Sequence, residues 1–158
     1  MLRPFCSAGI LSNHESPLRP AQFITRKIAK AAVAIQRGLE DKIVVGDLDA
    51  LVDWGYAPDY VVAMWMILQL EEPDDFVIAS GALHTVQDLV KIACEVVGLN
   101  WENHVVEDRG LLKGNRRLTT LQGNATKLTR LTNWRPQVSF EEMVKQLVLA
   151  EMAGCGHP

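Results

Sequence analysis

The sequence predicts a single α/β domain in which short strands alternate with amphipathic helices, so that some strands pair in parallel. Three observations support this prediction. The chain has 158 residues, and one domain typically holds roughly 150. Apolar runs of strand length alternate with longer segments whose apolar residues recur at helical spacing. Glycine or proline follows most of these segments, as is typical of element ends.

Short apolar runs mark the predicted strands, which cover residues 5–11, 42–46, 76–79 and 104–107. The polar segment 13–20 contains two prolines and is predicted to form a loop at the carboxyl end of the first strand. Residues 47–56 follow neither periodicity and are predicted to be irregular. In an isolated chain the first strand would leave unpaired edges, so we expect poor solubility or oligomers.

About five helices are predicted from helical spacing and from their end signals. They cover residues 22–37, 59–70, 86–97 and 124–132, and a last helix begins at Phe140. Gly38 and Gly98 end two of these helices. Thr85 and Ser139 each precede an acidic residue by three positions, which is the pattern of a capping box.

The segment 59–70 is apolar on all sides, which predicts a helix buried on more than one face. We therefore expect Met64, Trp65 and Met66 to lie in the core. The remaining helices carry a single apolar stripe and are expected to bury one face each.

Composition excludes several classes of function. The 16 basic and 19 acidic side chains give a formal net charge of −3, which argues against nucleic acid as a partner. No apolar run approaches the roughly 18 residues of a membrane span. The three cysteines and four histidines show neither CxxC nor metal-ligand spacing, so no metal site or disulfide framework is predicted. Cys94 lies in an apolar stripe and is expected in the core, and a reduced, cytoplasmic setting is indicated.

No catalytic residue is predicted. The only G-x-G lies in the C-terminal tail, at residues 154–156, where no helix follows to form a dinucleotide fingerprint. Neither Tyr56 nor Tyr60 has a lysine four residues later, so a Tyr-x-x-x-Lys acid/base pair is absent from this sequence.

Three polar segments are open to a functional or a structural interpretation. The segment 13–20 places amide, imidazole, carboxylate, hydroxyl and guanidinium groups after a buried strand, where ligands bind in open α/β sheets, but it also suits a solvated loop. The segment 53–60 suits a ligand site or a tight turn whose aromatic residues pack into the core. The basic loop suits a diphosphate-binding site or a loop whose charges are simply solvated. Its cations are Arg109, Lys113, Arg116 and Arg117.

Several motifs together resemble the GDP-mannose 4,6-dehydratase family. They are G-I-L-S-N-H-E-S-P at 9–17, F-I-T-R-K-I at 23–28, G-D-L-D-A at 46–50, D-W-G-Y-A-P-D-Y-V at 53–61 and E-P-D-D-F-V-I-A at 72–79. Their order and spacing hold from about residue 5 to residue 152. The combination of the Asn-His-Glu-Ser-Pro segment with the Asp-Trp-Gly-Tyr segment is more specific than a general α/β pattern.

The resemblance implies an extended short-chain dehydrogenase/reductase, with NADP in an N-terminal Rossmann domain and GDP-mannose held mainly by a C-terminal portion. It implies conversion of GDP-mannose to GDP-4-keto-6-deoxymannose, a fucose precursor, in which the cofactor carries the hydride. Full-length members are expected to be homo-oligomers. The family's glycine-rich turn and catalytic residues would precede Met1, so residues 1–153 correspond to the C-terminal substrate-binding portion and 154–158 to a frayed tail.

Site residues are implied by the same resemblance. His14 and Arg19 match positions that contact NADP, and Asn13 and Lys27 match segments near the nucleotide sugar. The family also carries arginines where this chain has Val52 and Leu18, and Pro20 stands where it has glycine. Loss of those cations weakens diphosphate binding unless other cations compensate, and the candidates are Arg116 and Arg117.

The resemblance leaves three functions open. The chain corresponds to part of a dehydratase that is inactive alone, to a stand-alone nucleotide-sugar-binding or subunit-interaction module, or to part of a sister nucleotide-sugar reductase or epimerase. Catalytic identity in this superfamily resides largely in the N-terminal half, so the sequence does not choose among them.

Overall fold

A computed structural model describes residues 4–111 and 120–154. Within these ranges the chain forms five α-helices and seven short strands, which confirms the predicted mixed α/β class and the expected number of helices. The helices are α1 (Ile24–Gln36), α2 (Ala57–Ile67), α3 (Val86–Val96), α4 (Thr126–Thr132) and α5 (Phe140–Met152). The strands are β1 (Ala8–Leu11), β2 (Asn13–Glu15), β3 (Ile43–Val45), β4 (Leu51–Tyr56), β5 (Asp75–Ile78), β6 (Leu83–Thr85) and β7 (Val105–Glu107).

The strands form three small sheets. β1 pairs with β5 in parallel, and β3 pairs with β7 in parallel. In the third sheet, β4 lies between β2, to which it is parallel, and β6, to which it is antiparallel. The parallel pairs confirm the expected topology, because each joins strands that are separated by at least one helix along the chain.

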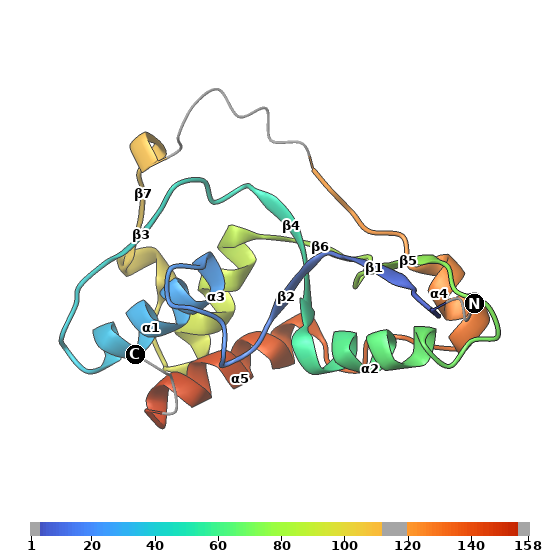
Figure 1. The fold of residues 1–158 in the computed structure, drawn as a ribbon. Helices are drawn as coiled ribbons and strands as arrows, with labels where there is room; N and C mark the ends of the chain where they lie inside the picture. The colour runs from blue at the N-terminus through green and yellow to red at the C-terminus, as the bar shows by residue number, and fades with distance from the viewer. Residues whose placement is uncertain (1–3, 112–119, 155–158) are drawn as a thin grey trace.

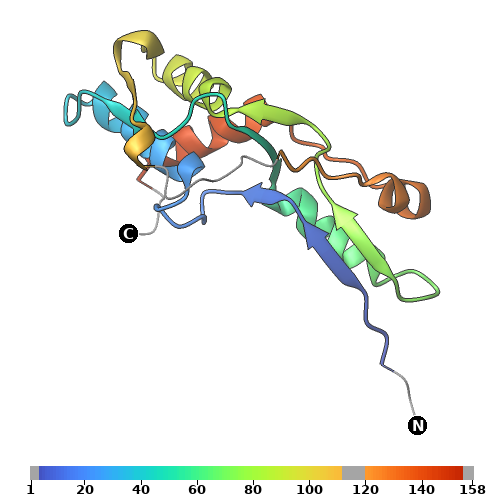
Figure 2. The same cartoon turned by 90° about the horizontal axis from the view of Figure 1, so that it is seen from above.

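The helices divide between two regions (Figures 1 and 2). We call α1, α3 and α5, with β3 and β7, the helical lobe; its core includes Ile28, Leu89 and Leu147. We call β1, β5, α2 and α4 the sheet lobe; its core includes Tyr60 and Phe76. The central β2–β4–β6 sheet joins the lobes, because α2 of the sheet lobe directly follows β4 and α3 of the helical lobe directly follows β6.

Helix ends agree with the predicted signals. Thr85 and Asp88 form a reciprocal capping box: the Thr85 hydroxyl accepts from the Asp88 amide at 3.0 Å, and the Asp88 carboxylate accepts from the Thr85 amide at 2.9 Å. The Ser139 hydroxyl accepts from the amide of Glu142 at 3.2 Å. Gly98 ends α3 with φ of +74°, a left-handed conformation that favours glycine.

Two segments predicted without regular structure form strands instead. Residues 51–56 were expected to be irregular but form β4, and residues 13–15, expected in a loop, form β2. Both predictions are wrong for the same reason. Each segment is short and partly polar, and its conformation depends on hydrogen bonds to a strand about 40 residues away along the chain.

The prediction that α2 is buried on several faces is also wrong. Only one stripe of the helix is buried, formed by Asp59, Tyr60, Ala63 and Ile67. Trp65, expected in the core, is 61% exposed, whereas Met64 and Met66 are half-buried against the sheet-lobe core. No helix in the described part of the chain is both long and apolar enough to cross a membrane.

Candidate functional site

A buried carboxylate of the central sheet joins that sheet to the sheet lobe, beside the carboxyl ends of β1 and β5. Asp53 of β4 is 1% exposed. Its Oδ1 accepts hydrogen bonds from the Ser12 hydroxyl at 3.1 Å and from the Ser80 hydroxyl at 2.6 Å and amide at 3.1 Å. Its Oδ2 accepts from the amides of Gly81 at 3.1 Å and Gly123 at 3.0 Å. One side chain of β4 therefore ties the carboxyl ends of β1 and β5 to the segment before α4.

A chain of hydroxyl groups extends this network to α2. The hydroxyl oxygens of Tyr60 and Ser12 lie 2.7 Å apart. Because the Ser12 hydroxyl donates to Asp53, the Tyr60 hydroxyl donates to Ser12. Desolvation is the main cause that raises the pKa of Tyr60, to about 12, so this donor keeps its proton at neutral pH.

His14 of β2 lies beside this network. Its ring centroid is 5.5 Å from that of Tyr60, and its Nδ1 lies 3.1 Å from the carbonyl oxygen of Ser12. Gly55 is the register partner of His14, and a Cβ there would collide with the Tyr60 ring. The packing interpretation of the segment 53–60 is therefore confirmed for Tyr60, and Trp54 is buried as well.

The loop that follows β2 is held by a buried arginine. Arg26 of α1 is 3% exposed, and its Nη1 donates to the carbonyl oxygens of Pro17 at 2.6 Å and Arg19 at 2.8 Å. Its Nε donates to the carboxylate of Glu151 in α5. Residues 16–19 form a turn whose Leu18 is 71% exposed, as the loop interpretation expects, but Arg26 ties its backbone to the helical lobe.

Arg19 lies against Glu15 and Phe23. The Glu15 carboxylate is 2% exposed; its Oε2 accepts from the Thr25 hydroxyl at 2.7 Å and lies 3.4 Å from the Arg19 Nε. The Arg19 guanidinium carbon is 3.6 Å from the centre of the Phe23 ring. Burial is the main cause that raises the pKa of Glu15, against the opposing effects of Thr25 and Arg19.

The predicted site residues are only partly brought together. Successive side chains of a strand point to opposite faces, so His14 packs on α2 whereas Asn13 and Glu15 face the other way. Lys27 is exposed on α1, and its Nζ donates to the carbonyl oxygen of Val44 at 3.0 Å. Arg19 stacks on Phe23, which lies one helical turn before Lys27. The predicted site residues Arg19 and Lys27 therefore flank the same end of α1.

Two predicted substrate-binding residues, Arg116 and Arg117, lie outside the described residues, as does Lys113. The fourth cation of that predicted loop, Arg109, lies 3.6 Å from a carboxylate oxygen of Glu107 and is largely exposed. The diphosphate prediction for this loop therefore stays a prediction. Groups of three or more His, Cys, Asp or Glu side chains placed to hold a metal ion are absent from the described ranges.

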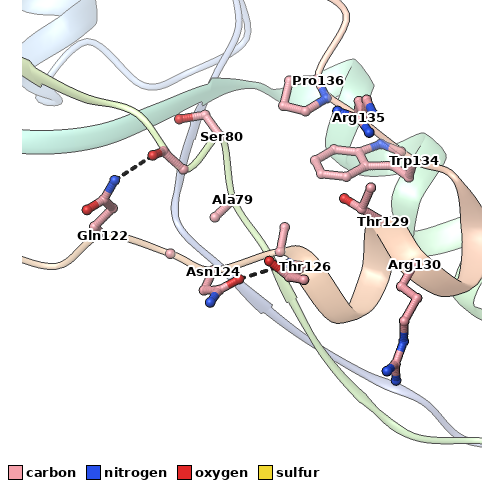
Figure 3. Close-up of a pocket in the computed structure, with 13 residues that line it drawn as sticks. Ala79, Ser80, Gln122, Asn124, Thr126, Thr129, Arg130, Trp134, Arg135 and Pro136 are labelled. Carbon is pink, nitrogen blue, oxygen red and sulfur yellow. Dashed lines mark hydrogen bonds between the residues drawn. The ribbon is translucent and has the colours of Figure 1, made fainter.

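A hollow that sequence reasoning missed lies between the end of β5 and α4 (Figure 3). Its volume is about 1010 Å³, and its lining includes Ser80, Gln122, Thr129 and Trp134. The Gln122 amide donates to the carbonyl oxygen of Gly81 at 2.6 Å, which closes one side (Figure 3). None of its residues belongs to the predicted site, although Ala79 ends one of the family motifs and several others lie in the predicted helix 124–132.

The comparisons with known proteins agree with this arrangement. The family described as GDP-mannose 4,6 dehydratase matches residues 3–147. The chain belongs to the GDP-mannose 4,6-dehydratase family. It is 44% identical to GDP-mannose 4,6 dehydratase 1 of Arabidopsis thaliana over 140 residues, which is 89% of this chain and 38% of that protein. It is 40% identical to the human GDP-mannose 4,6 dehydratase over 164 residues, 94% of this chain and 44% of that protein.

Solved structures place the same fold in related enzymes. The structure of RMD from Pseudomonas aeruginosa complexed with NADPH superposes with a TM-score of 0.80 at 18% identity, covering 92% of this chain and 47% of that one. A UDP-glucose 4-epimerase from Thermotoga maritima, solved with UDP-glucose, gives 0.76 at 20% identity, covering 94% and 46%. The chain thus spans less than half the length of these relatives, and the structural likeness shows the fold alone.

Proposed function

We propose that this chain is the C-terminal, substrate-binding portion of a GDP-mannose 4,6-dehydratase, which converts GDP-mannose to GDP-4-keto-6-deoxymannose. The observation that carries the proposal is the 44% identity to a GDP-mannose 4,6 dehydratase across 89% of the chain. The chain spans 38% of that relative, and we infer that the groups that carry out the reaction lie in the remainder. We assign no catalytic residue to it.

NADP is the proposed cofactor, and it would take up and return the hydride. His14 and Arg19 are the residues proposed to contact it. Arg19 suits a phosphate group because a guanidinium pairs with two phosphate oxygens at once. Its terminal nitrogens form no hydrogen bond or ion pair with the described residues, so they are free for such a ligand. His14 offers the ring nitrogen Nε2, since Nδ1 faces the Ser12 carbonyl.

GDP-mannose is the proposed substrate. Asn13 and Lys27 are the proposed contacts within the described residues, joined by Arg116 and Arg117. The Lys27 amine is exposed and bonded to one backbone carbonyl, so it has two remaining protons for a diphosphate or base oxygen. Val52 occupies a position where the family carries arginine, and it packs against the helical-lobe core. We therefore expect weaker diphosphate binding than a chain with arginine there would give.

Ligand-induced stabilisation tests the substrate proposal. GDP-mannose should raise the Tm of the 158-residue chain, because a ligand that binds only the folded state stabilises it. Lys27→Gln should reduce the shift. Lys42→Gln is the matched control, since Lys42 is also an exposed lysine whose Nζ donates to a backbone carbonyl, that of Asn103. No shift with millimolar GDP-mannose, or equal loss in both variants, would contradict the proposal.

Reconstitution tests the partial-enzyme proposal. The chain alone should form no GDP-4-keto-6-deoxymannose from GDP-mannose and NADP. Addition of the N-terminal part of the Arabidopsis thaliana relative, which lies outside the matched 38%, should produce it. Product formed by the chain alone would contradict the assignment of catalysis to the other portion. Assembly into homo-oligomers and a cytoplasmic setting stay predictions.

A second candidate is a nucleotide-sugar-binding or subunit-interaction module without catalysis. The exposed apolar face of α2 favours it, since Val61 and Trp65 are 60% and 61% exposed and offer a surface for another polypeptide. A sister reductase or epimerase shares the same fold. Preference for GDP-mannose over UDP-glucose in the stabilisation assay would separate the dehydratase portion from part of a UDP-sugar epimerase, and the reconstitution assay separates it from a module without catalysis.

A further inference from the structure

We propose that Glu15 and Phe23 are positioning residues that hold the Arg19 guanidinium as a preformed binding site for a phosphate group. The inference rests on the proposed role of Arg19 and deepens it. It assigns functions to a buried carboxylate and an aromatic ring that the proposed contacts with NADP and GDP-mannose leave unexplained.

The first support is the environment of the Arg19 Nε. This atom is buried and has no hydrogen-bond partner within the described residues. It lies 3.4 Å from the Glu15 Oε2, close enough for attraction but without hydrogen-bond geometry. That oxygen instead accepts the Thr25 hydroxyl at 2.7 Å. Glu15 therefore orients the Nε edge of the Arg19 guanidinium and leaves the N–H groups of that guanidinium without a hydrogen bond to the carboxylate.

The second support is the stacking on Phe23. The guanidinium carbon lies 3.6 Å from the ring centre, so one face of the planar group is covered. With the Nε edge buried and one face stacked, the edge that carries the two terminal nitrogens remains available. Two parallel N–H groups in a fixed plane match two oxygens of a phosphate.

The third support is the fixed backbone beneath the side chain. Arg26 donates to the carbonyl oxygens of Pro17 and Arg19, and its own charge is paired with Glu151. The amide of Arg19 donates to the carbonyl oxygen of Ser16 at 2.9 Å, closing a turn. The backbone of Arg19, the Nε edge of its guanidinium and one face of that group are thus held before any ligand binds. This reduces the entropy that is lost on binding.

A purely structural role for Glu15 predicts a different result. If the Glu15–Arg19 pair only stabilised the fold, its loss would lower the Tm. If the carboxylate only contributed charge, its removal would strengthen anion binding, because a negative charge beside the site disfavours an anion. A positioning role predicts a different result in each measurement. Glu15→Gln keeps the contact with Thr25, so the Tm should be unchanged or higher. Anion binding should be weaker and not stronger.

The experiment titrates the 158-residue chain with inorganic pyrophosphate and follows the NMR signal of the Arg19 Nε–H, which should shift on binding. Arg19→Lys keeps the charge but loses the planar donor pair, and should weaken binding about tenfold. Glu15→Gln and Phe23→Leu should each weaken it about fivefold. Arg37→Gln is the charge-matched control and should bind as the unmodified chain does, since the Arg37 guanidinium donates to the carbonyl oxygen of Met152.

The outcomes separate this inference from the proposed function. Weaker binding in Glu15→Gln with an unchanged Tm supports positioning. Unchanged or tighter binding in Glu15→Gln and Phe23→Leu, with Arg19 still required, overturns positioning alone. No pyrophosphate binding, or no effect of Arg19→Lys, overturns the anion role of Arg19 as well. The GDP-mannose stabilisation assay, which depends on Lys27, tests the proposed function separately.

Discussion

Helices α2 and α3 each have 11 residues, but they bury their apolar side chains very differently. Every large apolar side chain of α3 is buried or half-buried. In α2, Val61, Val62 and Trp65 are 60%, 48% and 61% exposed. The α3 sequence alternates apolar and polar residues with helical period, whereas α2 is apolar on all sides. The comparison teaches that periodicity specifies which face of a helix is covered, whereas uniform hydrophobicity does not.

The difference follows from the surroundings of each helix. α3 packs against both α1 and α5 in the helical lobe, so its single stripe has two partners (Figure 1). α2 packs one stripe on the β1–β5 pair and α4, and its opposite side is not covered by the described residues. Within the described residues α3 has its apolar stripe covered, whereas the sheet lobe has an apolar face on α2 available for a partner.

The largest loss of stability is expected from removing the carboxylate that joins the central sheet to the sheet lobe. Asp53→Ala should destabilise the chain by about 3–5 kcal/mol, because the amides of Ser80, Gly81 and Gly123 lose their acceptor in a buried site. Chemical denaturation measures the change. Asp49→Asn, an exposed control on the same connection, should have little effect. A loss below 1 kcal/mol for Asp53→Ala would contradict the junction role.

Truncation within each helix tests the contrast between α2 and α3 directly. Leu89→Ala should cost about 3 kcal/mol, since Leu89 is 1% exposed in the helical-lobe core. Trp65→Ala removes a larger side chain but should change the unfolding free energy by about 0.5 kcal/mol or less, because the ring is exposed. Equal losses in the two variants would show that the α2 face is covered in solution.

The unfolding free energy at alkaline pH tests the role of the Tyr60 hydroxyl in the sheet lobe. The pKa of Tyr60 is raised from 10.0 to about 12, so its contribution to stability is complete below pH 10 and is lost as the pH rises toward 12. The unfolding free energy should therefore fall across this window. Tyr60→Phe should remove that part of the slope and cost about 1 kcal/mol at neutral pH. Identical slopes in the unmodified chain and in Tyr60→Phe would refute the buried hydroxyl chain.

The smallest effect on stability, and the clearest on assembly, is expected from the exposed face of α2. Replacing Val61 and Trp65 together by Gln should change the unfolding free energy by about 0.5 kcal/mol or less and should reduce self-association in size-exclusion chromatography. Leu39→Gln is the control, since Leu39 is 75% exposed in the helical lobe and should not alter association. If the unmodified chain already elutes as a monomer, the exposed face of α2 does not drive self-association.

Much of the helical lobe was predictable from local pattern. The stripe from Val86 to Val97, the Thr85 capping box and the glycine at position 98 specify α3 without reference to any other segment. The candidate site was reached differently. His14, Arg19, Asn13 and Lys27 were found through family resemblance, since neither spacing nor composition distinguishes them from a polar loop.

The sequence by itself determined the α/β class, the helices with a single stripe and their ends, because those features depend on contacts within about one helical turn. Only the tertiary structure decided that 51–56 is a strand, that Trp65 is exposed and that Asp53 joins five donors from three other segments. It also placed Glu15 and Phe23 against Arg19. The physical reason is that a strand pairing, an uncovered face or a buried carboxylate is defined by partners distant along the chain, and their approach depends on the packing of the whole core.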